Sequence, residues 1–129
     1  MKFNHLEKRK VVIADDDEDS RMLLAFLLED EGWLVEQAKN GKEAIEKVVQ
    51  EKPHLLILDN RMPELTGTQV YQQLQGQKID LTTILVTAYG DIEELASSLG
   101  IVHFLRKPID ISELLLIIES ASETRGDKQ

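Results

Sequence analysis

The chain has 129 residues, which is enough for one domain with a hydrophobic core and too few for a second domain. Hydrophobic residues make up 42% and charged residues 30%, so the chain is globular rather than disordered, and the lack of cysteine excludes disulfides and thiol chemistry. The 24 acidic and 15 basic residues give a net charge of -9, which argues against direct binding to nucleic acid or to an anionic membrane.

Five short apolar runs alternate with five helix-like segments. The apolar runs cover residues 11–14, 33–35, 55–58, 84–86 and 101–105, and the helical segments cover residues 20–31, 41–51, about 67–75, 91–98 and 112–123. Gly32, Pro53 and Gly100 follow three of the helices, and Asp91 and Ser112 are placed as N-caps of two. This alternation predicts an α/β fold, a doubly wound five-stranded parallel sheet with helices on both faces.

The same pattern divides the chain into an N-terminal arm (residues 1–9), the domain (10–123) and a C-terminal tail (124–129). The arm is polar and basic and lacks the apolar stretch of a signal peptide. No run approaches the roughly 18 apolar residues of a membrane span. We therefore expect a cytoplasmic protein without membrane contacts.

Reactive side chains follow the predicted strands at their carboxyl ends, where open parallel sheets hold their active crevice. The first strand runs into five acids (residues 15–19), the third ends at Asp59, the fourth at Thr87, and the fifth near Lys107. Carboxylates this close repel one another unless a hard cation lies among them, and a few carboxylates with water suit Mg²⁺ better than Ca²⁺. An aspartate beside Mg²⁺, with a lysine and a hydroxyl nearby, is typical of a nucleophile for phosphoryl transfer.

Four motifs stand in order at these strand ends: Ile13-Ala14-Asp15-Asp16, Leu58-Asp59-Asn60-Arg61-Met62-Pro63 with Gly67 following, Val86-Thr87-Ala88, and Lys107-Pro108. Together they resemble the motif set of response-regulator receiver domains of two-component signalling, and the resemblance covers residues 10–121. It implies a flavodoxin-like sheet with the strand order 2-1-3-4-5. It also implies a cis peptide before the proline of the Lys-Pro motif.

The resemblance further implies the role of each site residue. Asp59 would accept the phosphoryl group, Asp16 would bind Mg²⁺ directly, and Asp15 would bind it largely through water. The backbone carbonyl of Arg61 would be another metal ligand. Thr87 and Lys107 would contact the phosphoryl oxygens.

Two further sets of residues would respond to phosphorylation or control it. Phe104 would change rotamer together with Thr87 and Ala88 as the conformational switch, although Phe104 is also explained as plain core. Arg61 and Tyr89 are bulky residues beside the phosphoryl position. We hypothesise that they shield the acyl phosphate and lengthen its life, which suits a relay intermediate.

The choice of acids in the first motif is a matter of register. Arg21 lies six residues after Asp15, a spacing found in many members of the family, and the apolar run stops at Ala14. Asp15 and Asp16 are therefore the predicted pair. The three acids that follow (residues 17–19) are explained as loop and helix N-terminal acids that the helix macrodipole favours.

Helical spacing indicates where partners bind. In the first helix, one stripe consists of Leu23, Leu24, Leu27 and Leu28, and the opposite stripe consists of Met22, Ala25 and Phe26. We expect Met22, Ala25 and Phe26 to form the outward stripe and to dock a sensor histidine kinase or a histidine phosphotransfer protein, unless Phe26 folds onto its own domain. In the last helix, Leu116 is a candidate contact for a homodimer or a downstream protein target.

Three alternative functions compete with a phosphoacceptor. An Asp-nucleophile phosphatase of the haloacid-dehalogenase type needs a second acid two residues after the nucleophile, where this chain has Arg61. A flavodoxin-like electron carrier needs a hydroxyl- and amide-rich loop after the first strand, where this chain has aspartates. A receiver-like module that takes no phosphate stays open. We predict a signalling switch or relay intermediate that phosphorylates and dephosphorylates itself and is not a turnover enzyme.

Overall fold

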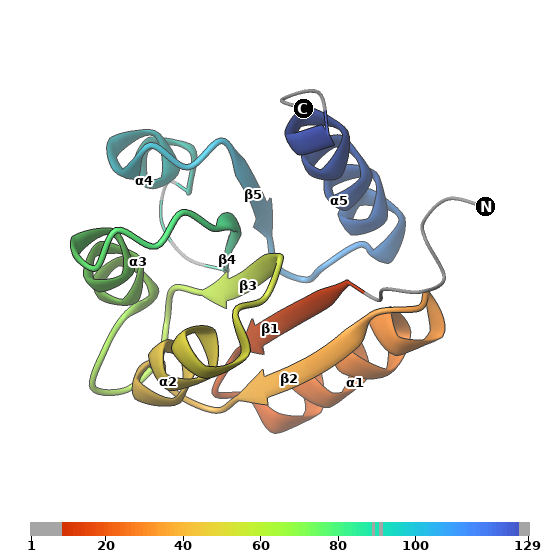
Figure 1. The fold of residues 1–129 in the computed structure, drawn as a ribbon, viewed down its shortest axis with the longest axis horizontal. Coiled ribbons are helices and arrows are strands. Elements are labelled where there is room, and N and C mark those ends of the chain that lie inside the picture. Colours follow the sequence, from red (N-terminus) through yellow and green to blue (C-terminus); the bar gives the residue numbers. More distant parts are fainter. Residues whose placement is uncertain (1–8, 89, 91, 127–129) are drawn as a thin grey trace.

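The computed structural model describes residues 9–88, 90 and 92–126, with side chains described up to residue 121. Strands and helices alternate along the chain (Figure 1). The strands are β1 (Lys10–Ala14), β2 (Leu34–Ala38), β3 (Leu55–Asp59), β4 (Thr82–Thr87) and β5 (His103–Arg106). The helices are α1 (Glu18–Asp30), α2 (Gly41–Glu51), α3 (Gly67–Gly76), α4 (Ile92–Leu99) and α5 (Ile111–Gly126).

All five strands are parallel, and their order across the sheet is β2-β1-β3-β4-β5. The helices α1 and α5 cover one face of the sheet, and α2, α3 and α4 cover the other (Figure 1). The predicted doubly wound fold and strand order are therefore confirmed. The order reverses direction between β1 and β3, which places the crevice at the carboxyl ends of these two strands.

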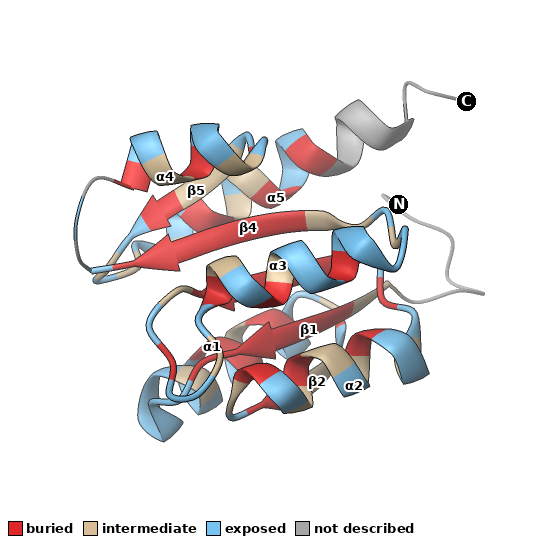
Figure 2. Cartoon of the chain, turned by 90° about the vertical axis from the view of Figure 1, so that its left-hand side faces the viewer, coloured by how far each residue is buried: buried red, intermediate tan, exposed pale blue. Residues whose placement is uncertain are grey.

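Successive residues of the central strands face opposite helix layers. Val11 and Ile13 of β1 pack in the cluster that α1 and α5 cover, whereas Val12 and Ala14 pack in the cluster that α2 and α3 cover. The strands β1 and β4 are consequently buried over almost their whole length (Figure 2). Burial on both faces is why these runs are continuously apolar and do not alternate with polar residues.

Side-chain caps fix where the helices begin. The N-caps of the first three helices are Asp17, Asn40 and Thr66. At α5 the side chain of Asp110 accepts a hydrogen bond from the backbone of Glu113 at 3.2 Å, so the expectation that Ser112 caps this helix was wrong. Both residue types make good caps, and the cap lies two residues earlier than the sequence suggested. The other expected cap, Asp91, lies outside the described residues.

Two predicted strands begin later than expected, and the last helix is longer. Trp33 precedes β2, and residues 101–102 precede β5. Trp33 and Ile101 are apolar because the core buries them in the turns that lead into these strands, whereas Val102 is exposed. The final helix continues to Gly126, past the predicted end at residue 123.

The face that α1 turns to the sheet also differs from the predicted one. Its buried residues are Leu24, Ala25 and Leu28, and its exposed apolar residues are Met22, Leu23 and Phe26. The placement of Ala25 on the outward stripe was wrong, because Ala25 is buried beside Leu24 and Leu28 in the cluster that α1 and α5 cover. Leu23 turns outward in its place. Phe26 is 65% exposed and does not fold onto its own domain.

The helix α5 likewise leaves one large apolar side chain in solvent. Leu116 is 67% exposed, in line with its predicted outward position, whereas Leu114 and Ile118 are buried in the core. Within the described part of the chain, no helix combines the length and apolarity that crossing a membrane would require.

Candidate functional site

The predicted site residues meet at one edge of the sheet. Asp15 follows β1 directly, Asp59 is the last residue of β3, Thr87 is the last residue of β4, and Lys107 follows β5. Because the strands are parallel, their carboxyl ends share an edge, and the register pairs Asp59 with Val86. The backbone N–H of Lys107 donates to the carbonyl of Thr87 at 3.1 Å, which ties the last two of these strand ends together.

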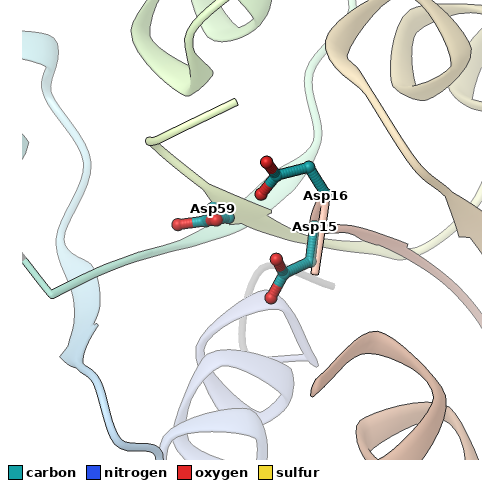
Figure 3. Close-up of side chains that lie close together, drawn as sticks. All are labelled: Asp15, Asp16 and Asp59. Atoms are coloured by element: carbon teal, nitrogen blue, oxygen red, sulfur yellow. The ribbon is translucent and has the colours of Figure 1, made fainter. Parts of the chain in front are cut away.

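Three carboxylates gather at this edge. One oxygen of each of Asp15, Asp16 and Asp59 can be chosen so that all three lie within 4.8 Å of one another. Asp15 and Asp16 leave the end of β1 in different directions, and Asp59 lies beside them at the end of β3 (Figure 3). Asp15 and Asp59 are 6% and 5% exposed, whereas Asp16 is exposed to solvent.

The ammonium of Lys107 lies between the two buried acids. Its Nζ is 3.0 Å from Oδ2 of Asp15 and 3.4 Å from Oδ2 of Asp59. Burial alone would lower the pKa of Lys107, but its hydrogen bonds and charge interactions with Asp15 and Asp59 outweigh that effect and raise its pKa. Lys107 therefore stays charged and serves as a counterion for carboxylates that would otherwise repel each other.

Asp59 is an unusually basic carboxylate. Burial raises its pKa to about 6, and the neighbouring negative charge of Asp15 acts in the same direction, while Lys107 and the backbone N–H of Arg61 oppose both. At neutral pH Asp59 is therefore largely ionised, yet it is a better nucleophile than an ordinary surface aspartate.

The loop between β3 and α3 is held closed against the end of β3. The side-chain oxygen of Asn60 accepts hydrogen bonds from the backbone N–H of Thr68 at 2.9 Å and from its hydroxyl at 3.0 Å. A Cβ on Gly67 would lie 2.7 Å from the carbonyl oxygen of Asp59, so only glycine lets α3 begin this close to the strand. The backbone N–H of Arg61 is 3.4 Å from Oδ1 of Asp59.

The predicted switch residues lie on the other side of Asp59. Thr87 is buried, and Ala88 follows it in an exposed position. Phe104 is half-buried and packs against the cluster that links β4 to α4, together with Leu95 and Leu99. Tyr89 lies outside the described residues.

An open pocket of about 510 Å³ lies beside Thr87, between the β3–α3 loop and the start of α4. Asn60, Arg61 and Met62 line one side of it, and Leu95 lines the other. From the sequence, a role is predicted for Arg61 but none for Asn60, although Asn60 stands in the same motif; the structure shows that its side chain bonds Thr68 and closes the loop.

The donor set suits a hard divalent cation. The clustered ligand atoms are carboxylate oxygens, which Mg²⁺ prefers, and they come from two adjacent strand ends. Two of the acids are buried with only one ammonium between them, so a further positive charge here would relieve repulsion. Asp15, Asp16 and Asp59 therefore fit a metal site.

Comparisons with known proteins agree with this arrangement. A family model described as the response regulator receiver domain matches residues 11–119. Sporulation initiation phosphotransferase F of Bacillus subtilis is 33% identical over 107 residues, covering 81% of this chain and 86% of that protein.

Solved structures give the same result. The response regulator receiver domain protein (CheY-like) of Methanospirillum hungatei is 26% identical with a TM-score of 0.84, covering 94% of this chain and 99% of that one. Response regulator protein TrrA of Thermotoga maritima, in complex with Mg²⁺ and BeF, is 30% identical with a TM-score of 0.80, covering 88% of this chain and 98% of that one.

Proposed function

This chain belongs to the response regulator receiver family of two-component signalling, and we propose that it accepts a phosphoryl group from a phosphohistidine onto Asp59. The observation that carries the proposal is the environment of Asp59, a buried carboxylate beside Lys107 and two further acids. In the transfer, an Asp59 oxygen attacks phosphorus and forms a P–O bond, while the P–N bond of the donor breaks and its electron pair returns to the imidazole nitrogen.

The chain's own residues would bind and orient the phosphoryl group. Lys107 would turn from Asp59 toward the phosphoryl oxygens, and the hydroxyl of Thr87 would donate to another of them. We assign Asp15, Asp16, Asp59 and the backbone carbonyl of Arg61 to a Mg²⁺ site, by analogy with the relative TrrA, whose structure includes Mg²⁺. Bound Mg²⁺ would supply positive charge that offsets repulsion between the carboxylates and the phosphoryl oxygens.

The output would be a change of shape. Thr87 moves toward the phosphoryl group in this proposal, and Ala88 and Phe104 repack beside it, which alters the surface formed by β5 and α4. Arg61 and Tyr89 would shield the acyl phosphate from water and slow its hydrolysis. A long-lived phosphoryl group suits a relay intermediate, and the relative named phosphotransferase is compatible with that role.

The outer face of α1 is the proposed docking site for the phosphodonor. It carries Met22, Leu23 and Phe26, all more than half exposed, and α1 begins directly after the acidic loop of the site. Asp19 and Asp30 lie on the same helix face at the two ends of this apolar patch. Two copies of this face would bring like charges together, so the surface favours an apolar helix flanked by basic residues on a kinase or phosphotransfer protein.

The proposal also covers the extent of the domain, its location in the cell and its output. The domain would span residues 10–123, act in the cytoplasm, and pass its signal to a protein target rather than to nucleic acid, with Leu116 available for a target or a second copy. Its self-phosphorylation and self-dephosphorylation would make it a switch and not a turnover enzyme.

Acetyl phosphate with Mg²⁺ tests the proposal directly. We expect intact mass spectrometry to find one added phosphoryl group on the wild type and none on Asp59→Asn. Asp17→Asn is the matched control, because Asp17 belongs to the same run of acids but caps α1 through Ser20. Its phosphorylation should persist. A folded wild-type protein that takes no phosphoryl group would instead be a receiver-like interaction module.

A further inference from the structure

We propose that Arg21 is a positioning residue that fixes the peptide between Asp15 and Asp16 and so directs Asp16 toward the cation. This inference rests on the proposed Mg²⁺ site. Nη1 of Arg21 donates to the backbone carbonyl oxygen of Asp15 at 2.8 Å, and its Nε donates to the side-chain oxygen of Gln37 at 3.0 Å. The guanidinium is therefore held at two points, one on the acidic loop and one on the edge strand β2.

The backbone of Asp15 is anchored to β2 on both sides. Its N–H donates to the carbonyl of Ala38 at 3.1 Å, which continues the β1–β2 ladder by one residue. Its carbonyl is bound by Arg21, whose other contact is Gln37, the neighbour of Ala38 on the same strand. The edge strand β2 thus holds the backbone of Asp15 in place where β1 ends and the acidic loop begins.

Fixing this carbonyl fixes the start of Asp16. The peptide bond is planar, so the orientation of the Asp15 carbonyl sets the orientation of the Asp16 N–H and limits where its Cα and side chain point. The orientation of the Asp15 carboxylate does not depend on Arg21, because the carboxylate accepts a hydrogen bond from the backbone N–H of Asp17 at 2.9 Å and pairs with Lys107. Asp16 is the exposed acid of the three, and its direction depends more on its backbone.

Geometry, rather than charge alone, is what Arg21 contributes in this proposal. A guanidinium presents several donors in one rigid plane, whereas a lysine ammonium carries the same charge on a flexible stem and does not reproduce both contacts. Arg21→Lys therefore separates the two contributions. Gln37→Ala removes the second anchor at an exposed position and leaves the contact with the Asp15 carbonyl in place.

The experiment is calorimetric titration of Mg²⁺ into the full chain, with the melting temperature in EDTA measured for every variant. We expect Arg21→Met to raise the Kd for Mg²⁺ by about 10-fold or more, as is usual when a residue that orients a metal ligand is lost. Arg21→Lys should recover only a minor part of that loss. Gln37→Ala should weaken binding by about 2- to 3-fold, and adding it to Arg21→Met should have no further effect.

The possible outcomes separate this inference from its premise. A merely structural Arg21 would lower the melting temperature in EDTA without changing the Kd, and this would overturn the inference. Wild-type affinity in Arg21→Lys would also overturn it, because charge would then suffice. If Arg21→Met does not fold, Arg21→Lys and Gln37→Ala still decide the matter. A wild type that does not bind Mg²⁺ would instead contradict the proposed metal site.

Discussion

Replacing the candidate nucleophile should stabilise the metal-free domain at neutral pH. Burial raises the pKa of Asp59 from 3.8 to about 6, so folding favours its protonated form. For a carboxyl group whose pKa rises on folding, the native state binds the extra proton between the two pKa values, and stability therefore falls as pH rises through this window. At about 1.36 kcal/mol per pKa unit, the loss between pH 4 and pH 7 is about 3 kcal/mol.

Asp59→Asn removes this dependence, because asparagine is neutral at every pH and has nearly the shape of protonated aspartate. The variant's advantage over the wild type should grow by about 3 kcal/mol from pH 4 to pH 7 and change little above that. Urea unfolding in EDTA at a series of pH values measures this difference. The test compares how the difference in stability between the two proteins changes with pH. Any effect of the substitution that is independent of pH cancels in this comparison.

The adjacent acidic loop provides a control with the opposite sign. The hydrogen bonds that Asp17 accepts from Ser20 lower the pKa of Asp17, so the wild type should gain stability relative to Asp17→Asn as pH rises through the acid range. The explanation given for Asp59 is refuted if its variant shows a constant difference across the pH series. It is also refuted if the wild type gains stability relative to Asp59→Asn as pH rises, because the charge of Lys107 would then affect the pKa of Asp59 more than burial does.

Three further substitutions test the docking face, the shielding hypothesis and the packing at α3. Phe26→Ser should slow phosphotransfer from a sensor kinase, selected from a panel of the organism's kinases, by about 10-fold, because one strong interface contact is lost. The same substitution should leave the rate of labelling by acetyl phosphate unchanged. Equal slowing of both reactions would contradict the proposed docking site. Arg61→Asn should speed loss of phosphate from the isolated protein, followed by the decay of the phosphorylated mass, and an unchanged or longer half-life would count against shielding. Gly67→Ala should lower the free energy of unfolding in urea by about 2 kcal/mol or more, because its Cβ would lie 2.7 Å from the Asp59 carbonyl, and wild-type stability would show that the loop yields easily.

The fold was predictable because the sequence signals for it are local. Continuous apolar runs indicated buried parallel strands, and Pro53 and Gly100 marked ends of helices that the structure contains. The faces of α1 were less predictable, since the bulky leucines suggested one orientation and packing selected another. Ala25 is buried together with Leu24 and Leu28, and this rotation of the helix is set by packing in the assembled layers, which the sequence spacing of the leucines does not contain.

The site was predictable in position but not in its contacts. Strand-end rules brought Asp15, Asp59 and Lys107 to one edge, and the structure places them there. The rules do not say that Lys107 lies between the two acids, a contact between residues 92 positions apart, or that Arg21 bonds the Asp15 carbonyl. Such contacts depend on side-chain rotamers, which are set by packing between elements distant in sequence.

In the proposed mechanism, the charges at the site require a bound cation before Lys107 can turn toward the phosphoryl group. Three carboxylates with one ammonium leave a net negative charge, and Lys107 already bonds both buried acids. An incoming phosphoryl group adds further negative charge, so Lys107 can turn toward it only if another cation takes over the acids. We therefore expect metal binding and phosphoryl capture to be coupled, because the ammonium of Lys107 that bonds both buried acids would have to be released before it could bind a phosphoryl oxygen.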